Sequence, residues 1–189
     1  MVGAHGRCEH GLHDHLTVDH DGAIDAAAGR EDRDLPRHDE LRRMGPDLLD
    51  PGFDAAEALR RLRDRPAAAI GDALLNQRVL AGIGNVYKSE VLFVCRVPPF
   101  AVVRDLPDAV LSRLIESGRR LLRANVAEGP ASNTRGGFRR TTGRMAPGER
   151  LWVYGRARLP CRRCGTPIAV RAHGPDARLT YWCPTCQPS

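Results

Sequence analysis

The sequence has almost no lysine, few aromatic residues and no long apolar run. Lys88 is the only lysine among 29 basic residues, and Phe, Trp and Tyr together make up 5% of the 189 positions. No apolar stretch approaches the roughly 20 residues that a membrane-spanning helix needs. The N-terminus also lacks the basic start and apolar stretch of a signal peptide. We therefore expect a cytoplasmic protein that does not interact with membranes.

Charge is unevenly distributed along the chain. The formal net charge is +6, but residues 1–40 contain ten acidic residues against four Arg, which leaves +12 on residues 41–189. Such an excess favours a polyanionic partner, nucleic acid ahead of a membrane, and the alternative is a well-solvated basic surface. Because 28 of the basic residues are Arg, a bias that a GC-rich coding sequence also produces, position must show which arginines matter.

Four of the six cysteines form two closely spaced pairs. Two residues separate Cys161 from Cys164 and Cys183 from Cys186, and 18 residues lie between the pairs. Two such pairs on turns supply a tetrahedral zinc site with zinc–sulfur distances of about 2.3 Å. The alternative is two disulfides, which intracellular proteins seldom keep. Four thiolates leave no open coordination position, so we predict one structural Zn²⁺ per chain.

The segments around these cysteines have the pattern of short strands. Residues 168–171 and 179–182 are predicted to pair as a hairpin, and residues 151–154 (LWVY) as a strand that enters this unit. A unit of about 30 residues has little core of its own, so zinc should stabilise it substantially. Cys95 follows a helical pattern and is interpreted as a small buried apolar residue rather than a nucleophile.

The middle of the chain has the apolar spacing of helices. Asp54 followed by Glu57 predicts a capping box at the start of the first helix. The spacing predicts four helices, at residues 55–63, 70–80, 86–95 and about 107–127. The fold class is therefore mainly α, a four-helix module followed by a small four-cysteine zinc hairpin.

Residues 1–43 show neither helical nor alternating periodicity and are predicted to be disordered or a misread segment. The domain boundaries that we expect are 45–130 for the helical module and 150–188 for the zinc unit. The N-terminal segment holds a cluster of possible metal ligands: Cys8, His10, His13, His15 and His20. Their spacing follows no compact ligand pattern, so an incidental polar tract is the preferred interpretation.

A glycine-rich turn separates the second and third predicted helices. In the segment 81–85 (AGIGN), Gly82 and Gly84 can adopt positive φ, so that successive N–H groups and the next helix N-terminus point at one place. This geometry suits a phosphate. Asn85 can cap the helix and also donate its amide to an anion. The alternative is a tight turn between core helices.

Sequence motifs in the helical and cysteine-rich parts resemble one protein family. Residues 74–93 (LLNQRVLAGIGNVYKSEVLF) are similar to the helix-two-turn-helix of the formamidopyrimidine-DNA glycosylase and endonuclease VIII family. The family's zinc finger resembles three further segments: residues 152–156 (WVYGR), 161–168 (CRRCGTPI) and 178–186 (RLTYWCPTC). The segment TTGR at 141–144 is similar to the bacterial endonuclease VIII branch.

The resemblance implies the damaged-DNA-binding half of a base-excision repair DNA glycosylase and abasic-site lyase. Its partner would be double-stranded DNA with a damaged base or abasic site, bound by a monomer near the bacterial nucleoid. In the family a β-sandwich precedes this module and begins with a Pro nucleophile and a Glu. Here Met1 is followed by Val2 and Gly3, so we expect a chain without the β-sandwich that is catalytically incomplete. The alternative function is a non-catalytic, zinc-containing nucleic-acid-binding protein.

Site residues can be carried over only where the motifs match. The resemblance implies that Asn85, with Gly82 and Gly84, holds the phosphates that flank the lesion. It also implies that Arg178 contacts the DNA backbone and assists elimination after base removal; the alternative is an exposed hairpin arginine. For Lys88, a solvated helix face is the expected environment.

Overall fold

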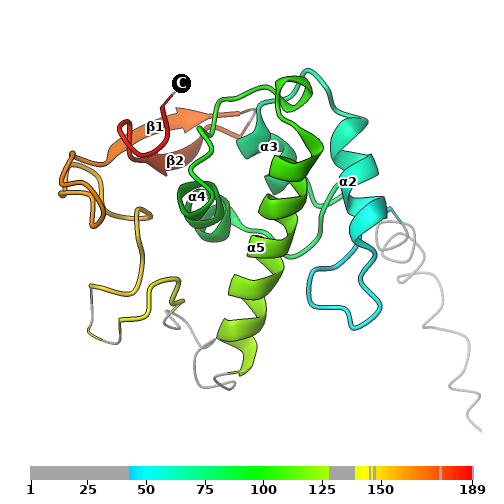
Figure 1. The fold of residues 1–189 in the computed structure, drawn as a ribbon, viewed down its shortest axis with the longest axis horizontal. Helices are drawn as coiled ribbons and strands as arrows, with labels where there is room; N and C mark the ends of the chain where they lie inside the picture. Colours follow the sequence, from blue (N-terminus) through cyan, green and yellow to red (C-terminus); the bar gives the residue numbers. More distant parts are fainter. Residues whose placement is uncertain (1–42, 128–138, 145, 147, 175, 189) are drawn as a thin grey trace, which may run out of the picture. The chain divides into compact units, whose positions relative to one another are not determined.

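The computed structural model describes residues 43–127, 139–144, 146, 148–174 and 176–188. The described elements, in chain order, are α2 (Ala55–Arg63), α3 (Ile70–Leu75), α4 (Asn85–Val94), the 3-10 helix η1 (Val103–Asp105), α5 (Asp108–Ala127), β1 (Ala169–His173) and β2 (Arg178–Trp182) (Figure 1). The mainly α architecture agrees with the sequence-based expectation. The N-terminal segment, including the possible ligands Cys8 to His20, lies outside the described residues. Among those that are described, no helix is long and apolar enough to cross a bilayer.

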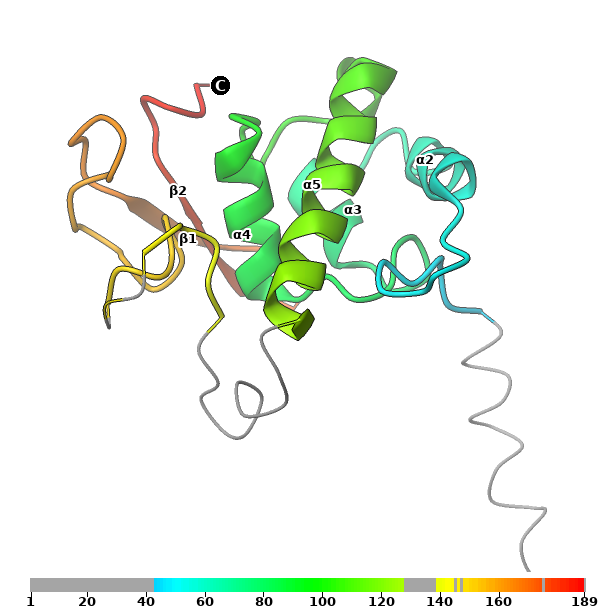
Figure 2. The same ribbon diagram turned by 60° about the horizontal axis from the view of Figure 1, so that its bottom comes forward.

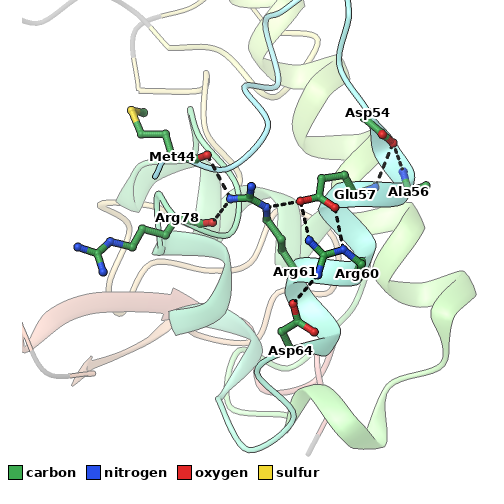
Figure 3. Close-up of polar contacts among 8 residues, drawn as sticks. All are labelled: Met44, Asp54, Ala56, Glu57, Arg60, Arg61, Asp64 and Arg78. Atoms are coloured by element: carbon green, nitrogen blue, oxygen red, sulfur yellow. Dashed lines mark hydrogen bonds and ion pairs between the residues drawn. The ribbon is translucent and has the colours of Figure 1, made fainter. Parts of the chain in front are cut away.

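Helix α2 begins as its sequence predicts, but only half of the capping box forms. The Asp54 carboxylate accepts hydrogen bonds from the amides of Ala56, at 2.9 Å, and Glu57, at 3.0 Å. The Glu57 carboxylate turns forward to bind Arg60 and Arg61 instead of reaching back to Asp54 (Figure 3). Hydrogen bonds from these two arginines lower the pKa of Glu57 to about 2. Two guanidinium groups thus compete successfully with one backbone N–H for the carboxylate.

Helix α3 is shorter than the predicted helix 70–80, which is wrong beyond Leu75. Asn76 leaves the helical conformation with φ −75° and ψ 106°, and its carbonyl then accepts bonds from two amides of the following turn. The Gln77 side chain donates to the carbonyl of Ile83 at 2.9 Å and so spans this turn. Backbone bonds to the Asn76 carbonyl and side-chain bonds from Gln77 together shape a turn in place of a continued helix.

The main core lies between α2, α4 and α5, and its members are fully or almost fully buried apolar side chains. Helix α4 is central, because every residue from Tyr87 to Phe93 is buried, and it contacts both α5 and β2 (Figure 2). Burying one large aliphatic side chain contributes about 1.5–3 kcal/mol, so α4 holds a large share of the stabilising contacts. Cys95, at the end of α4, is buried beside the Ser117 hydroxyl, as the sequence predicted.

The predicted strand at 151–154 is wrong. This segment is a loop whose three consecutive amides at 152–154 donate to the buried carboxylate of Glu90 on α4, at 2.8–2.9 Å. The Thr141 hydroxyl donates to the same carboxylate. A carboxylate removed from water needs such donors, and the loop supplies them at the expense of strand pairing.

The two strands form the predicted hairpin. β1 and β2 pair antiparallel, from Ala169 opposite Trp182 to His173 opposite Arg178. The pairing extends the predicted first strand by two residues beyond Arg171. The hairpin packs on α4, so it joins the cysteine-rich unit to the helical module.

Candidate metal centre and nucleic-acid interface

The four paired cysteines converge at one point. One pair precedes β1 and the other follows β2, and their Sγ atoms all lie within 4.8 Å of one another. The Sγ atoms of Cys161 and Cys186 are 3.9 Å apart, and those of Cys164 and Cys183 are 3.4 Å apart. A tetrahedral zinc site with bonds of about 2.3 Å has sulfur–sulfur edges of about 3.8 Å. The residues therefore fit one structural zinc ion.

The surroundings of the four sulfur atoms suit a bound cation. Without a metal, burial raises the pKa of Cys183 and Cys186, which favours their neutral thiols, whereas hydrogen bonds with Thr166 lower the pKa of Cys164 to about 6. Four thiolates this close need a positive ion between them. Backbone amides of Arg163 and Cys186 each donate to a cysteine sulfur at 3.4 Å. When bound, zinc supplies the cross-link that a unit with so small a core lacks.

The zinc unit has a small core that α4 completes. Phe93, the largest member, comes from α4 and packs with Val153, Ile168 and the buried cysteines. The Arg163 guanidinium stacks over the Phe93 ring at 4.5 Å and donates to its carbonyl. The zinc unit is therefore fixed to one end of α4.

The opposite end of α4 carries the glycine turn. Gly82 has φ +101°, as predicted, which explains the need for glycine there. The expectation of positive φ is wrong for Gly84, which has φ −101° and ψ −179°. An added Cβ at Gly84 would meet no atom within 4 Å. Gly84 thus gives a ligand close access to the backbone, whereas Gly82 shapes the turn.

Asn85 does not cap α4 as the sequence suggested. Gly84 occupies the N-cap position, and no side chain caps the helix. The first N–H groups of α4 therefore remain available, and they carry the positive end of the helix dipole. The Asn85 amide nitrogen donates to the carbonyl of Leu179 at 2.9 Å, while its Oδ1 atom is buried and has no partner among the described residues.

The turn opens into a hollow of about 420 Å³. Its lining includes both glycines, Asn85, Tyr154 and Arg139. The sequence motifs did not indicate Arg139 and Tyr154 as binding residues. Tyr154 lies in a motif that indicated only the zinc unit, and Arg139 lies outside every motif. The hollow therefore combines free backbone N–H groups with a positive side chain.

Arg178 lies next to Asn85, because Asn85 binds the carbonyl of the residue that follows Arg178. Its side chain is 54% exposed and forms an ion pair with Asp176 at 3.3 Å. Exposed ion pairs contribute only about 0–1 kcal/mol, so a phosphate can replace Asp176 as its partner. The structure thus brings together two site residues that 92 intervening positions separate in the sequence.

Lys88 does not lie on a solvated helix face, and that expectation is wrong. The residue is 1% exposed, and its Nζ atom donates to the Thr180 hydroxyl at 2.7 Å. Burial lowers the pKa of Lys88 to about 8, against the opposing effect of the Asp72 carboxylate. Gly71 on α3 packs near the lysine stem and closer still to the Pro99 carbonyl oxygen, which an added Cβ would approach to 3.0 Å. A helix buried on all sides has no solvated face, which the motif alone could not reveal.

A second bond fixes the hairpin to α3. The Nδ1 atom of His173 lies 3.1 Å from Oδ1 of Asp72. Gly174, with φ +77°, follows directly, and a Cβ there would come within 2.7 Å of the same carboxylate oxygen. Together with the Lys88 bond to Thr180 in the middle of β2, this contact holds the hairpin against α3 and α4.

Comparison with known proteins agrees with this geometry. Residues 44–135 match the formamidopyrimidine-DNA glycosylase H2TH domain, and residues 158–188 match the zinc finger found in FPG and IleRS. The "Probable endonuclease 8 2" of Streptomyces coelicolor is 49% identical over 76% of this chain and 49% of its own length. A formamidopyrimidine-DNA glycosylase of Rhizorhabdus wittichii is 33% identical over 95% of this chain and 68% of its own.

Solved structures share the fold. The complex between Lactococcus lactis Fpg and DNA containing an abasic site matches with a TM-score of 0.65 and 27% identity, over 84% of this chain and 56% of that one. The chain spans about half the length of several curated relatives that it matches. With both family domains, the four-thiolate zinc site and the open glycine turn in place, the chain belongs to the formamidopyrimidine-DNA glycosylase and endonuclease VIII family.

Proposed function

We propose that this chain is the DNA-holding half of a base-excision repair glycosylase and abasic-site lyase of the endonuclease VIII type. One observation carries the proposal, namely that Asn85 and the exposed Arg178 lie side by side at an uncapped helix N-terminus. The name of the Streptomyces relative and the abasic-site DNA in the Lactococcus complex support it. The partner that follows is a single damaged duplex bound by a monomer.

The site holds a phosphate backbone through three kinds of donor. The first N–H groups of α4 bind one phosphate oxygen, and the absence of a Cβ at Gly84 permits the close approach. Asn85 adds its second amide hydrogen, and Arg178 provides a charge-assisted hydrogen bond from β2. Contacts of this kind fix the position of the duplex without reading its sequence.

Elimination after base removal requires stabilisation of the departing phosphate. A guanidinium at the backbone suits that task, so we assign this step to Arg178, in agreement with the family resemblance. The step that must come before it needs an amine that attacks C1′. Lys88 is the only lysine, and at 1% exposure it cannot reach a nucleotide. The residues that the structure describes therefore bind and position DNA but contain no accessible lysine nucleophile.

Borohydride trapping on abasic-site DNA tests this assignment. Reduction captures a Schiff base as a covalent adduct, and we expect none from this chain alone although it binds the same duplex. Binding is measured in parallel by fluorescence anisotropy, with Arg178→Ala as the matched variant. Failure of the chain to bind, or equal binding by Arg178→Ala, would show that the DNA-holding role is wrong.

A non-catalytic, zinc-containing nucleic-acid-binding protein is the second candidate. The burial of Lys88 favours it, because the only lysine of the sequence is then not accessible as an amine nucleophile. The two functions predict different effects of an added catalytic domain on borohydride trapping. If the β-sandwich domain of a relative, supplied in trans, restores trapping only with intact Arg178, the repair function is supported; if it does not, the non-catalytic function is.

A further inference from the structure

A second basic hollow, of about 340 Å³, lies at the C-terminal end of α2 and the turn after α3. Its lining contains five arginines and one acidic residue: Arg43, Arg60, Arg61, Arg65 and Arg78, with Asp64. Exposed arginines alone mean little in a chain with 28 of them. What decides their role is which of the five already have partners.

Two of the five arginines are used by the fold itself. Arg60 binds the carboxylates of Glu57 and Asp64. Arg61 binds Glu57 and two backbone carbonyls, one before α2 and one in the turn after α3 (Figure 3). The Arg61 bonds hold the two flanking segments against α2, so its guanidinium is committed to the fold. The charge of Arg60 is already balanced by its two neighbouring carboxylates.

The other three, the outer arginines, are Arg43, Arg65 and Arg78. All are exposed, and within the described part of the chain their side chains make no hydrogen bond or ion pair. Figure 3 shows the Arg78 side chain directed away from the carboxylates of the cluster. Three uncompensated guanidinium groups around one hollow create a positive potential that attracts phosphate.

Arg65 connects this hollow to the one beside Arg178. It also lines a neighbouring hollow of about 360 Å³ that Arg178 lines too. The acids of that hollow already have partners, because Asp72 lies 3.1 Å from Nδ1 of His173 and Asp176 forms an ion pair with Arg178. Positive groups therefore continue from the proposed phosphate contact at Arg178, past Arg65, to the outer hollow.

We propose that the outer arginines bind the DNA backbone of the duplex that flanks the site held by Asn85 and Arg178. A duplex presents phosphates about every 3.4 Å along each strand, so it suits charges spread along a surface, whereas a small anion needs donors that converge. The inference rests on the proposed function, because Arg178 determines where the flanking duplex begins. An acidic protein segment is the rival occupant.

The experiment uses duplexes of two lengths, both with a central abasic site, and the full zinc-loaded chain. One duplex has about 8 base pairs and extends only about 14 Å to either side of the abasic site, whereas the other has about 30, so the longer one offers more phosphates to the outer hollow. The variant Arg65→Ala/Arg78→Ala should bind the long duplex about tenfold more weakly, and the slope of log K against log salt should fall by nearly two. Its affinity for the short duplex should change less than about twofold.

Arg120→Ala/Arg158→Ala is the control, because it removes two exposed arginines that line neither the hollow at the glycine turn, nor the one beside Arg178, nor the outer hollow. It should bind both duplexes like the parent chain. Neither double variant removes a side-chain hydrogen bond or ion pair within the described residues, so Tm and zinc content should stay unchanged. These two measurements show whether a variant that binds weakly is still folded.

The proposal would be overturned if Arg65→Ala/Arg78→Ala lost equal affinity for both duplexes, or if it lost no more affinity for the long duplex than the control variant does. It would also be overturned by full DNA affinity together with lost binding to a polyglutamate peptide, which would assign the surface to an acidic protein partner. The proposed function has its own readout. If Arg178→Ala leaves binding of the short duplex unchanged, the proposed function is wrong. The DNA contact of the outer arginines is then tested by their effect on affinity for the long duplex alone.

Discussion

At the scale of single residues, Arg178 has the properties of a phosphate contact. It is more than half exposed, its only ion pair among the described residues is with the more exposed Asp176, and Asn85 binds the adjacent carbonyl. A weakly held guanidinium exchanges partners readily. Asn85 is held more firmly, so its contribution combines DNA contact with attachment of β2.

Arg178→Ala should therefore weaken DNA binding about tenfold, since a hydrogen bond to a charged group is worth about 1.5–3 kcal/mol. The salt slope should fall by about one. Asn85→Ala should weaken binding less but lower Tm, because it frees the carbonyl of Leu179. Anisotropy titrations at several salt concentrations check both, with Arg158→Ala as the control; unchanged binding by Arg178→Ala would contradict the contact.

Lys88 should make stability depend on pH. Its folded pKa of about 8 lies below the usual 10.5, so between these values the unfolded chain binds more protons than the folded one. The free energy of unfolding should then rise with pH through that window, by about 2–3 kcal/mol. Below pH 8 both states are protonated and the penalty of the buried charge is constant.

In Lys88→Met, the free energy of unfolding should no longer rise with pH. Urea unfolding at pH 7.5 to 10, compared with the parent chain, measures this. Thr180→Val is the matched control, because it removes the hydrogen bond but keeps the buried ammonium group. It should retain the pH dependence and be less stable throughout. An identical pH profile for Lys88→Met and the parent chain would show that the lysine is not the titrating group.

At the scale of elements, α4 links the glycine turn to the zinc unit. Its N-terminus faces the glycine turn, its middle binds the loop at 152–154 through Glu90, and its end inserts Phe93 into the zinc unit. One rigid helix of 10 residues thus relates the zinc site to the proposed phosphate contact. This explains why the helix is buried along most of its length.

Glu90→Gln should release the loop at 152–154. A glutamine amide presents one oxygen and an N–H₂ group to a site where four donors converge, so some buried donors lose their partner. The expected loss is about 2–4 kcal/mol in urea unfolding, with faster proteolysis of the loop. The exposed Glu116→Gln is the control. Equal stability of the two variants would contradict the role of Glu90.

At the scale of the whole molecule, the placement of Arg178 depends on zinc, whereas the helical core does not. The main core and the zinc-unit core are separate clusters, and Phe93 of α4 belongs to the second. The helical core can therefore persist without metal, but the hairpin cannot hold Arg178 in place once the cysteine cross-link is lost.

Chelation should accordingly weaken DNA binding at least as much as Arg178→Ala does, while most helical circular dichroism remains. Metal analysis should find about one zinc per chain, and Cys183→Ser should lower zinc occupancy and binding together. Readdition of zinc should restore both in the parent chain. A metal-free chain that binds DNA normally would show that the four cysteines do not position the contact.

The sequence by itself determined the parts whose signals are local. The paired cysteines predicted the zinc site because two ligands on one turn need only short spacing, and three helices followed from apolar periodicity. Gly82 followed from turn chemistry. The family resemblance identified Asn85 and Arg178, whose DNA contacts remain predictions.

Only the tertiary structure decided the features that depend on neighbours distant in the sequence. The local sequence predicts a surface position for Lys88, but β2 and α3 pack over it and bury it. The sequence also predicts a strand at residues 151–154, but amides of this segment donate to the Glu90 carboxylate instead of to a neighbouring strand. α3 ends at Leu75 because Asn76 leaves the helical conformation, and the Gln77 side chain spans the turn that follows. The Lys88 ammonium group and the Glu90 carboxylate are buried and needed partners, and local sequence patterns carry no information about which distant residue supplies them.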